Sequence, residues 1–332
     1  MVNRILVPMD GSPLAECVLP HVMTFAQTFA ANLMLVHVME SGHMGESDEA
    51  VDPVRWQMAK NEAQAYLDTL LARLHSHAIE AQSSLLEGRP AECIFDFARD
   101  DQTDLIALSS HGHSGLGGWS VGSVAHKILV RARGAKLVVR ASTGAQPGGV
   151  LLDPLNAATY RRILVPLDGS WRAECVLPLA IKLAQFCEAE LVAAHVVRKP
   201  EMARRTPPTD EDAHLAAQVE ERNRQETSSY FDHLRTRLTH LTETHVLSGE
   251  SVAASLHELA DRTQVDLVIL SAHGFTGEMK WPYGSVAQSF IWGSAAPILI
   301  FDDSEPCPPM SMSVSEQAPM PTPRPHEVPT HA

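Results

Sequence analysis

The sequence lacks the features of several protein classes. Its 332 residues include five cysteines, an odd number without a CxxC pair, which argues against a disulfide framework and favours a reducing cytoplasm. No apolar run approaches the roughly 20 residues that cross a bilayer. The first residues, MVNRILVPMDGS, have no long apolar segment of the kind found in signal peptides. We therefore expect a cytoplasmic protein without membrane insertion.

Positive charge is also scarce. The chain has 26 Lys and Arg against 40 Asp and Glu, a formal net charge of −14. Nucleic acids and anionic membranes bind positive surfaces, so neither is expected as a general partner. The spacing of the recurring histidines, His37, His111, His195 and His273, does not indicate a metal-ligand set.

What the sequence does contain is a long repeat. RILVPMDGSPLAECVLP at 4–20 returns as RILVPLDGSWRAECVLP 158 residues later, and DLIALSSHG at 104–112 returns as DLVILSAHG 162 residues later. We therefore predict two copies of one domain, at residues 1–140 and 161–302, with a linker at 141–160. Residues 303–332 contain eight prolines and are expected to be a disordered tail.

Each copy alternates short apolar runs with helical patterns. In the first copy we expect strands at 4–7, 33–38, 81–86, 105–109 and 136–140, with helices after Ser12 and over 54–74, 91–100 and 122–131. The second copy has a longer helix, whose expected apolar face includes Leu215, Val219 and Leu241. This alternation predicts an α/β fold with a doubly wound parallel sheet in each copy.

A glycine-rich loop follows the fourth strand of each copy, and an aspartate, Asp10 or Asp168, follows the first. Ligands of such sheets bind beyond the carboxyl ends of the strands. Gly112 and Gly115 let backbone amides approach an anion, and the helix that opens at Gly122 favours phosphate. A carboxylate can accept hydrogen bonds from ribose, so the pattern indicates a nucleotide, although the same residues are also ordinary turn formers.

ILVPxDGS, SxHGxxG and GSVA, in this order on an alternating β/α unit, resemble the universal stress protein family in its tandem form. The resemblance covers about residues 3–140 and 161–301. It implies two five-stranded sandwiches of the adenine nucleotide alpha hydrolase-like type, with strand order 3-2-1-4-5. It also implies that the copies pair through their last strands, 136–140 and 297–301.

The resemblance further implies an adenine-nucleotide site in each copy. The family motif G-x2-G-x9-G-[ST] is present with serine, Ser109 or Ser271, in place of the first glycine. Implied ribose contacts are Asp10 and Asp168, and implied adenine contacts are Val38 and Val196. Implied phosphate contacts are Gly112, Gly122, Ser123 and Val124, with Gly274, Gly284, Ser285 and Val286 in the second copy. Pro8, Met9, Ser109, His111, Gly115 and Ala125 complete the candidate set. The expected ligand is ATP or AMP, with Mg²⁺ as an option, and no residue is assigned a catalytic role.

The two copies differ beside the loop. Lys127, Arg131 and Arg133 follow the first loop, whereas the second contains Glu278, so the first copy is favoured as the stronger site. Three functions stay open at this point: a stress-response protein acting through nucleotide-dependent conformation or partner binding, a slow nucleotide hydrolase, and a non-nucleotide interaction module. A homodimer of the chain is also open.

Overall fold

The structure, a computed structural model, describes residues 2–40, 52–112, 121–141, 156–200, 209–275 and 282–302. The expected tail at 303–332, most of the expected linker and Gly115 lie outside these described residues. No helix in the described ranges is both long and apolar enough to cross a membrane.

The two halves of the chain have the same order of elements. The first half contains β1 (Arg4–Met9), α1 (Pro13–Glu16), α2 (Leu19–Phe29), β2 (Asn32–Met39), α3 (Pro53–Ser76), β3 (Ala81–Glu87), α4 (Pro90–Asp100), β4 (Leu105–Ser109), α5 (Ser123–Arg131) and β5 (Ala135–Val139). The second half contains β6 (Arg162–Pro166), α6 (Trp171–Glu174), α7 (Leu177–Cys187), β7 (Glu190–Arg198), α8 (Asp210–Arg237), β8 (Leu241–Gly249), α9 (Val252–Arg262), β9 (Leu267–Ser271), α10 (Ser285–Gly293) and β10 (Ile298–Phe301).

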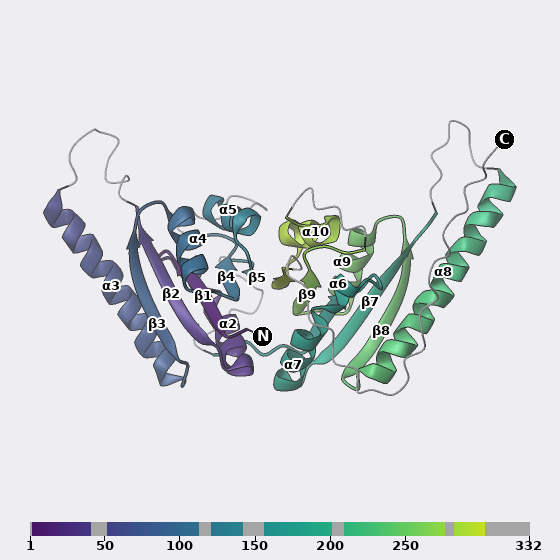
Figure 1. The fold of residues 1–332 in the computed structure, drawn as a ribbon, viewed down its shortest axis with the longest axis horizontal. Coiled ribbons are helices and arrows are strands. Elements are labelled where there is room, and N and C mark those ends of the chain that lie inside the picture. The colour runs from purple at the N-terminus through teal and green to yellow at the C-terminus, as the bar shows by residue number, and fades with distance from the viewer. Residues whose placement is uncertain are drawn as a thin grey trace, which may run out of the picture.

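The strands of both halves form one continuous sheet. Its order is β3-β2-β1-β4-β5-β10-β9-β6-β7-β8, which confirms the order 3-2-1-4-5 in each half. The strands are parallel within each half, and the halves join where β5 and β10 pair antiparallel with Leu137 opposite Leu299. Figure 1 shows the two halves side by side, with the long helices α3 and α8 at the outer ends.

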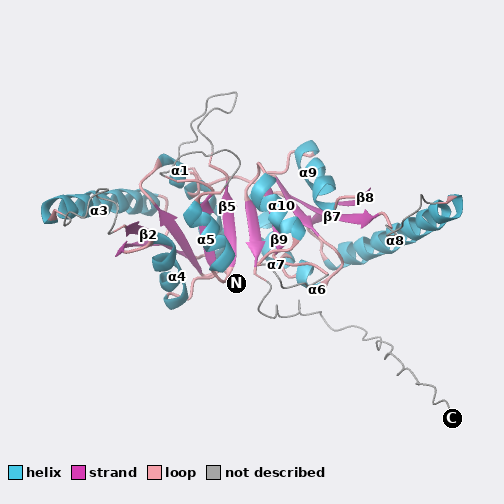
Figure 2. Ribbon diagram, turned by 90° about the horizontal axis from the view of Figure 1, so that it is seen from above, coloured by secondary structure: helices cyan, strands magenta, loops and turns pink. Residues whose placement is uncertain are grey.

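Helices cover both faces of the sheet, as Figure 2 shows from above. One buried core lies under α2, α3, α7 and α8, and a second lies under α4, α5, α9 and α10. Each core contains residues of both halves, for example Phe25 and Phe231 in the first and Ile128 and Phe290 in the second. The doubly wound α/β fold is therefore confirmed, with the two sandwiches fused into one.

The helix expected after Ser12 is divided in two. The Ser12 hydroxyl caps α1 by accepting from the Ala15 amide at 3.2 Å, but α1 ends at Glu16 and α2 begins at Leu19. Pro20 explains the break, because a proline has no N–H to donate and its ring clashes with the carbonyl four residues earlier. Pro178 occupies the same place at the start of α7.

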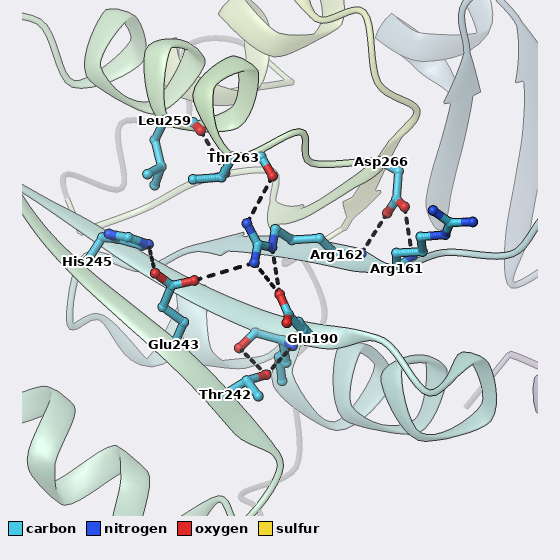
Figure 3. A network of polar contacts seen from close by, with 10 residues as sticks. Arg161, Arg162, Glu190, Thr242, Glu243, His245, Leu259, Thr263 and Asp266 are labelled. Atoms are coloured by element: carbon cyan, nitrogen blue, oxygen red, sulfur yellow. Dashed lines mark hydrogen bonds and ion pairs between the residues drawn. The ribbon is translucent and has the colours of Figure 1, made fainter.

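Two aspartates hold the strand starts in register. Figure 3 shows the carboxylate of Asp266, just before β9, accepting from the backbone amides of Arg161 and Arg162 at 2.7 and 3.1 Å. Asp104, just before β4, accepts from the amides of Asn3 and Arg4 at 2.6 and 3.0 Å. Each carboxylate thus fixes the first strand of its half against the fourth.

The junction of the halves contains buried polar groups. Lys136 on β5 is buried, with its Nζ 3.8 Å from Asp302. Burial lowers the pKa of Lys136 from 10.5 to about 8, and the charge of Asp302 partly opposes that shift. The Arg140 guanidinium donates to the carbonyls of Trp292 and Ser294 at the end of α10, at 2.9 and 3.4 Å. These bonds satisfy helix carbonyls that have no partner within the helix.

The segment before β6 also contacts the first half. The Thr24 hydroxyl on α2 donates to the Ala158 carbonyl at 2.6 Å, and His21 Nδ1 lies 2.8 Å from the hydroxyl of the buried Tyr160. The last residues of the expected linker, 156–160, are therefore packed against the first half.

Candidate functional site

The carboxyl ends of β1 and β4 meet at the candidate site of the first half. These strands are neighbours, so Asp10 and Gly112, which follow them, lie together. A Cβ built on Gly112 would fall 2.0 Å from Asp10 Oδ2, a distance that only glycine accommodates without movement of the carboxylate. The structure thus brings the aspartate and the glycine loop into one place, as the motif positions suggested.

A cavity of about 710 Å³ opens at these strand ends. This volume lies within the range of about 300–1,000 Å³ that is common for small-molecule sites. The sequence-derived candidates that line it are Pro8, Met9, Asp10, Val38, Ser109, His111, Gly112, Gly122, Ser123, Val124 and Ala125. Every first-half candidate within the described residues therefore borders this one cavity, which we call the first cavity.

Asp10 is positioned by the turn that follows it. Its Oδ1 accepts from the backbone amide of Ser12 at 2.9 Å and from the Ser12 hydroxyl at 2.6 Å. Because Ser12 also caps α1, the carboxylate and the helix start hold each other in place.

The serine that replaces the first motif glycine has a structural use. The Ser109 hydroxyl lies 2.8 Å from the Leu14 carbonyl and 2.6 Å from the His111 carbonyl. In the second half the Ser271 hydroxyl donates in the same way to the His273 carbonyl at 2.6 Å. The hydroxyl of this serine stabilises the turn leading to the second glycine.

The start of α5 borders the first cavity. The Gly122 amide donates to the Ser110 carbonyl at 2.8 Å, so this amide is already used within the chain. Gly122 has no side chain that could cap the helix, and the amides of the next residues, Ser123 and Val124, belong to the first turn. A helix start of this kind favours a phosphate or another anion.

Two histidines border the first cavity. His111 is buried, with its Nδ1 3.0 Å from the Ser110 hydroxyl. His37 also lines the first cavity, and burial lowers its pKa. No group of three or more His, Cys, Asp or Glu side chains in the described ranges could hold a metal ion.

One wall of the first cavity comes from α3, which the motif analysis did not include. Trp56, Ala59 and Ala63 line the cavity, whereas Val54 and Met58, two apolar residues near the start of the same helix, are 67% and 58% exposed. The spacing of Trp56, Ala59 and Ala63 by three and four residues is itself a helical face. That spacing could have identified these residues if alanine had been counted with the larger apolar side chains.

The second half repeats the backbone arrangement of the candidate site. A Cβ on Gly274 would fall 2.2 Å from Asp168 Oδ2, and the Gly284 amide donates to the Ala272 carbonyl at 2.7 Å. Ser285 and Val286 begin α10, and Val196 is buried in β7. The equivalence of the two halves therefore extends to backbone hydrogen bonds.

Asp168 is held by backbone amides that follow it in the fold. Asp168 Oδ1 accepts from the Ser170 amide at 2.9 Å, and its Oδ2 accepts from the Phe275 amide at 2.6 Å. Both oxygens are thus bonded within the chain. In the first half, Lys127, Arg131 and Arg133 are exposed and none of them lines the first cavity, so they give no support for a stronger site there.

Comparison with known proteins places both halves in one family. The model of the universal stress protein family matches residues 1–140 and 159–302. A universal stress protein of Methanocaldococcus jannaschii is 28% identical over 141 residues, covering 42% of this chain and 83% of that protein. A universal stress protein of Thermus aquaticus is 31% identical over 144 residues, covering 42% of this chain and all of that protein.

A solved structure spans both halves. A universal stress protein of Archaeoglobus fulgidus aligns with 91% of this chain and 99% of its own, with a TM-score of 0.61 and 17% identity. This likeness concerns the fold. Together with the two segments matched by the family model, it shows that the chain belongs to the universal stress protein family, as a tandem protein with two such domains.

Proposed function

We propose that the protein is a cytoplasmic stress-response protein that binds an adenine nucleotide in the first cavity. The observation that carries the proposal is the meeting of Asp10, Gly112 and the start of α5 around one cavity. The amides at the start of α5 would bind the phosphates, and the Asp10 carboxylate would accept from the ribose hydroxyls. Pro8, Met9 and Val38 would contact the adenosine moiety.

Mg²⁺ would bind as a complex with the phosphates of the nucleotide. The described part of the chain has no cluster of side chains suited to a metal ion, and Mg²⁺ in nucleotide sites keeps several waters and binds largely through phosphate oxygens. The assignment of ATP or AMP therefore does not depend on a metal site of the protein.

In this proposal the bound nucleotide changes the conformation of the protein. Helix α5 could transmit such a change, because it connects the first cavity with the second domain. Its first turn borders the first cavity, and its last turn contacts the second domain, because the Leu129 carbonyl accepts from the Tyr283 hydroxyl at 2.7 Å. The ring of His126 also lies 5.6 Å from that of Trp292 on α10. A shift of α5 on phosphate binding would therefore reach the junction of the domains.

Calorimetric titration of ATP with Mg²⁺ tests the proposal, using the full chain and the variants Gly122→Val and Gly284→Val. A Cβ at residue 122 has its nearest neighbour at 3.6 Å, so the backbone tolerates the change while the branched side chain crowds the start of α5. We expect Gly122→Val to lose binding and Gly284→Val to retain it. Absence of heat with the unmodified protein, and of nucleotide released on denaturation, would refute the proposal.

A further inference from the structure

The first cavity has two chemically different ends. Around Ser123 and Val124 it is formed by the start of a helix, whereas around Trp56, Ala59 and Ala63 it is formed by an apolar helix face. Val38, Met39 and Glu40 at the end of β2 also line the first cavity. A ligand that fills the first cavity therefore needs an anionic group and, away from it, an apolar surface.

The shape of the apolar end follows from its side chains. Ala59 and Ala63 are small, so α3 leaves space above the end of β2, and Trp56 lies one turn before them on the same face. Trp56 is half-buried, so its indole has a surface that a ligand can cover. An indole favours flat aromatic partners, which stack on it with offset rings.

The second domain lacks this wall. Matching ion pairs align α3 with α8 residue by residue. Arg73 on α3 lies 3.4 Å from Glu16, and Arg237 on α8 lies 3.3 Å from Glu174. In this register the place of Trp56 is taken by Glu220.

Two further positions near Glu220 on α8 also carry polar side chains. Thr227 takes the place of Ala63, and Arg224 takes that of Lys60. Arg224 donates to the Ser248 hydroxyl at 2.7 Å and pairs with Glu220 at 3.3 Å. The positions of Trp56 and Ala63 are thus polar in the second domain, whereas the position of Lys60 is cationic in both, with Lys60 paired to Glu87 at 2.9 Å.

We propose that Trp56 stacks on the purine of the nucleotide bound in the first cavity and sets the preference of that domain for a ligand with an aromatic base. This inference rests on the proposed function, because it assigns the base of the same ligand. It adds a determinant of ligand class that lies on α3, outside the loop motif. It also predicts that the first domain binds such a ligand more tightly than the second, since Glu220 presents a carboxylate where Trp56 presents a ring.

The test compares a ligand that has a base with one that lacks it. ATP and inorganic triphosphate are titrated into the full chain and into Trp56→Leu, with Glu220→Leu as the matched control. Stacking of a base on an aromatic side chain is worth about 1–3 kcal/mol, so we expect Trp56→Leu to weaken ATP binding on the order of tenfold. Triphosphate binding to Trp56→Leu and ATP binding to Glu220→Leu should not change.

A fluorescence measurement separates stacking from a structural effect. ATP should quench tryptophan emission in the unmodified protein, and Trp56→Phe should lose much of that quenching while keeping most of the affinity, because phenylalanine still stacks. Unchanged ATP affinity in Trp56→Leu would overturn the inference and leave the proposed function intact. Equal weakening of ATP and triphosphate would overturn it as well, because Trp56 would then act on the fold of the site. Failure of the unmodified protein to bind ATP would overturn both.

Discussion

Gly112 lies so close to Asp10 that a Cβ at residue 112 would fall 2.0 Å from the carboxylate oxygen Oδ2, and Gly274 has the same relationship to Asp168 at 2.2 Å. The glycine of the loop and the aspartate after the first strand therefore form a unit. A side chain at residue 112 and the present position of Asp10 exclude each other.

Gly112→Ala should displace the Asp10 carboxylate and weaken ATP binding by about tenfold. Asp10 also accepts from Ser12, so it cannot turn away without losing those bonds. Calorimetry of a double-mutant cycle with Asp10→Ala measures the effect. The double variant should bind no more weakly than Asp10→Ala alone, because the alanine at 112 then has no carboxylate to meet. Additive losses would show that residue 112 acts independently of Asp10.

Asp104→Ala should reduce the free energy of unfolding by about 1–3 kcal/mol, because two backbone amides at the start of β1 lose a charged acceptor. Urea unfolding followed by circular dichroism measures this loss. Asp101→Ala is a suitable control, since it removes the ion pair with the half-exposed Arg4 and a 3.4 Å hydrogen bond from the Thr103 hydroxyl, and a surface ion pair is worth about 0–1 kcal/mol. Equal losses in the two variants would contradict the role of Asp104 in strand register.

The titration of Lys136 should increase the free energy of unfolding as the pH rises from about 8 to about 10. The unfolded chain keeps the Lys136 proton up to a pKa of 10.5, whereas the folded chain releases it near 8. The unfolded state therefore binds more protons in this window, and the free energy of unfolding increases with pH.

The Lys136 contribution is isolated by comparison with Lys136→Met. Between pH 8 and 10 the unmodified protein should gain on the order of 2 kcal/mol relative to this variant. Other groups that titrate in this range are present in both proteins. Parallel stability curves for the two proteins would contradict the prediction.

His21 should make the fold sensitive to acid. Burial lowers the pKa of His21 to about 4 from 6.5, so between these values the unfolded chain binds a proton that the folded chain does not, and stability falls as the pH falls. The expected loss between pH 7 and pH 4 is on the order of 3 kcal/mol. His21→Gln retains a polar partner for Tyr160 and should unfold with a shallower pH dependence in thermal scans from pH 7 to 4. An unchanged pH dependence in that variant would be inconsistent with a neutral, buried His21.

The repeat and the strand alternation predicted the fold well because they depend on local, periodic patterns. The two copies, their doubly wound topology and the pairing of β5 with β10 all followed from the motif spacing and from the family that it resembles. The position of the site at the strand ends could be predicted because Asp10 and Gly112 closely follow the buried apolar strands β1 and β4.

The helices that flank the sheet were predicted less well. Leu215 and Val219, expected on the apolar face of α8, are 53% and 40% exposed, and Leu241 begins β8. Figure 1 shows α3 and α8 extending beyond the strands that they cover. A hydrophobic pattern predicts a face, but it does not show where the sheet beneath that face ends, and so the contribution of Trp56 to the site was missed.

The covalent joining of the two domains has a consequence for how they can diverge. Tethered partners meet at an effective concentration of about millimolar for short linkers, so dilution does not separate them. In a dimer of identical chains with two-fold symmetry, both chains contribute the same surface to the interface. Two domains joined in one chain can contribute different surfaces. Tyr283 of one domain already bonds to Leu129 of the other through a residue that the first copy does not have. The two halves can therefore specialise, with one half binding a ligand and the other responding to the bound state.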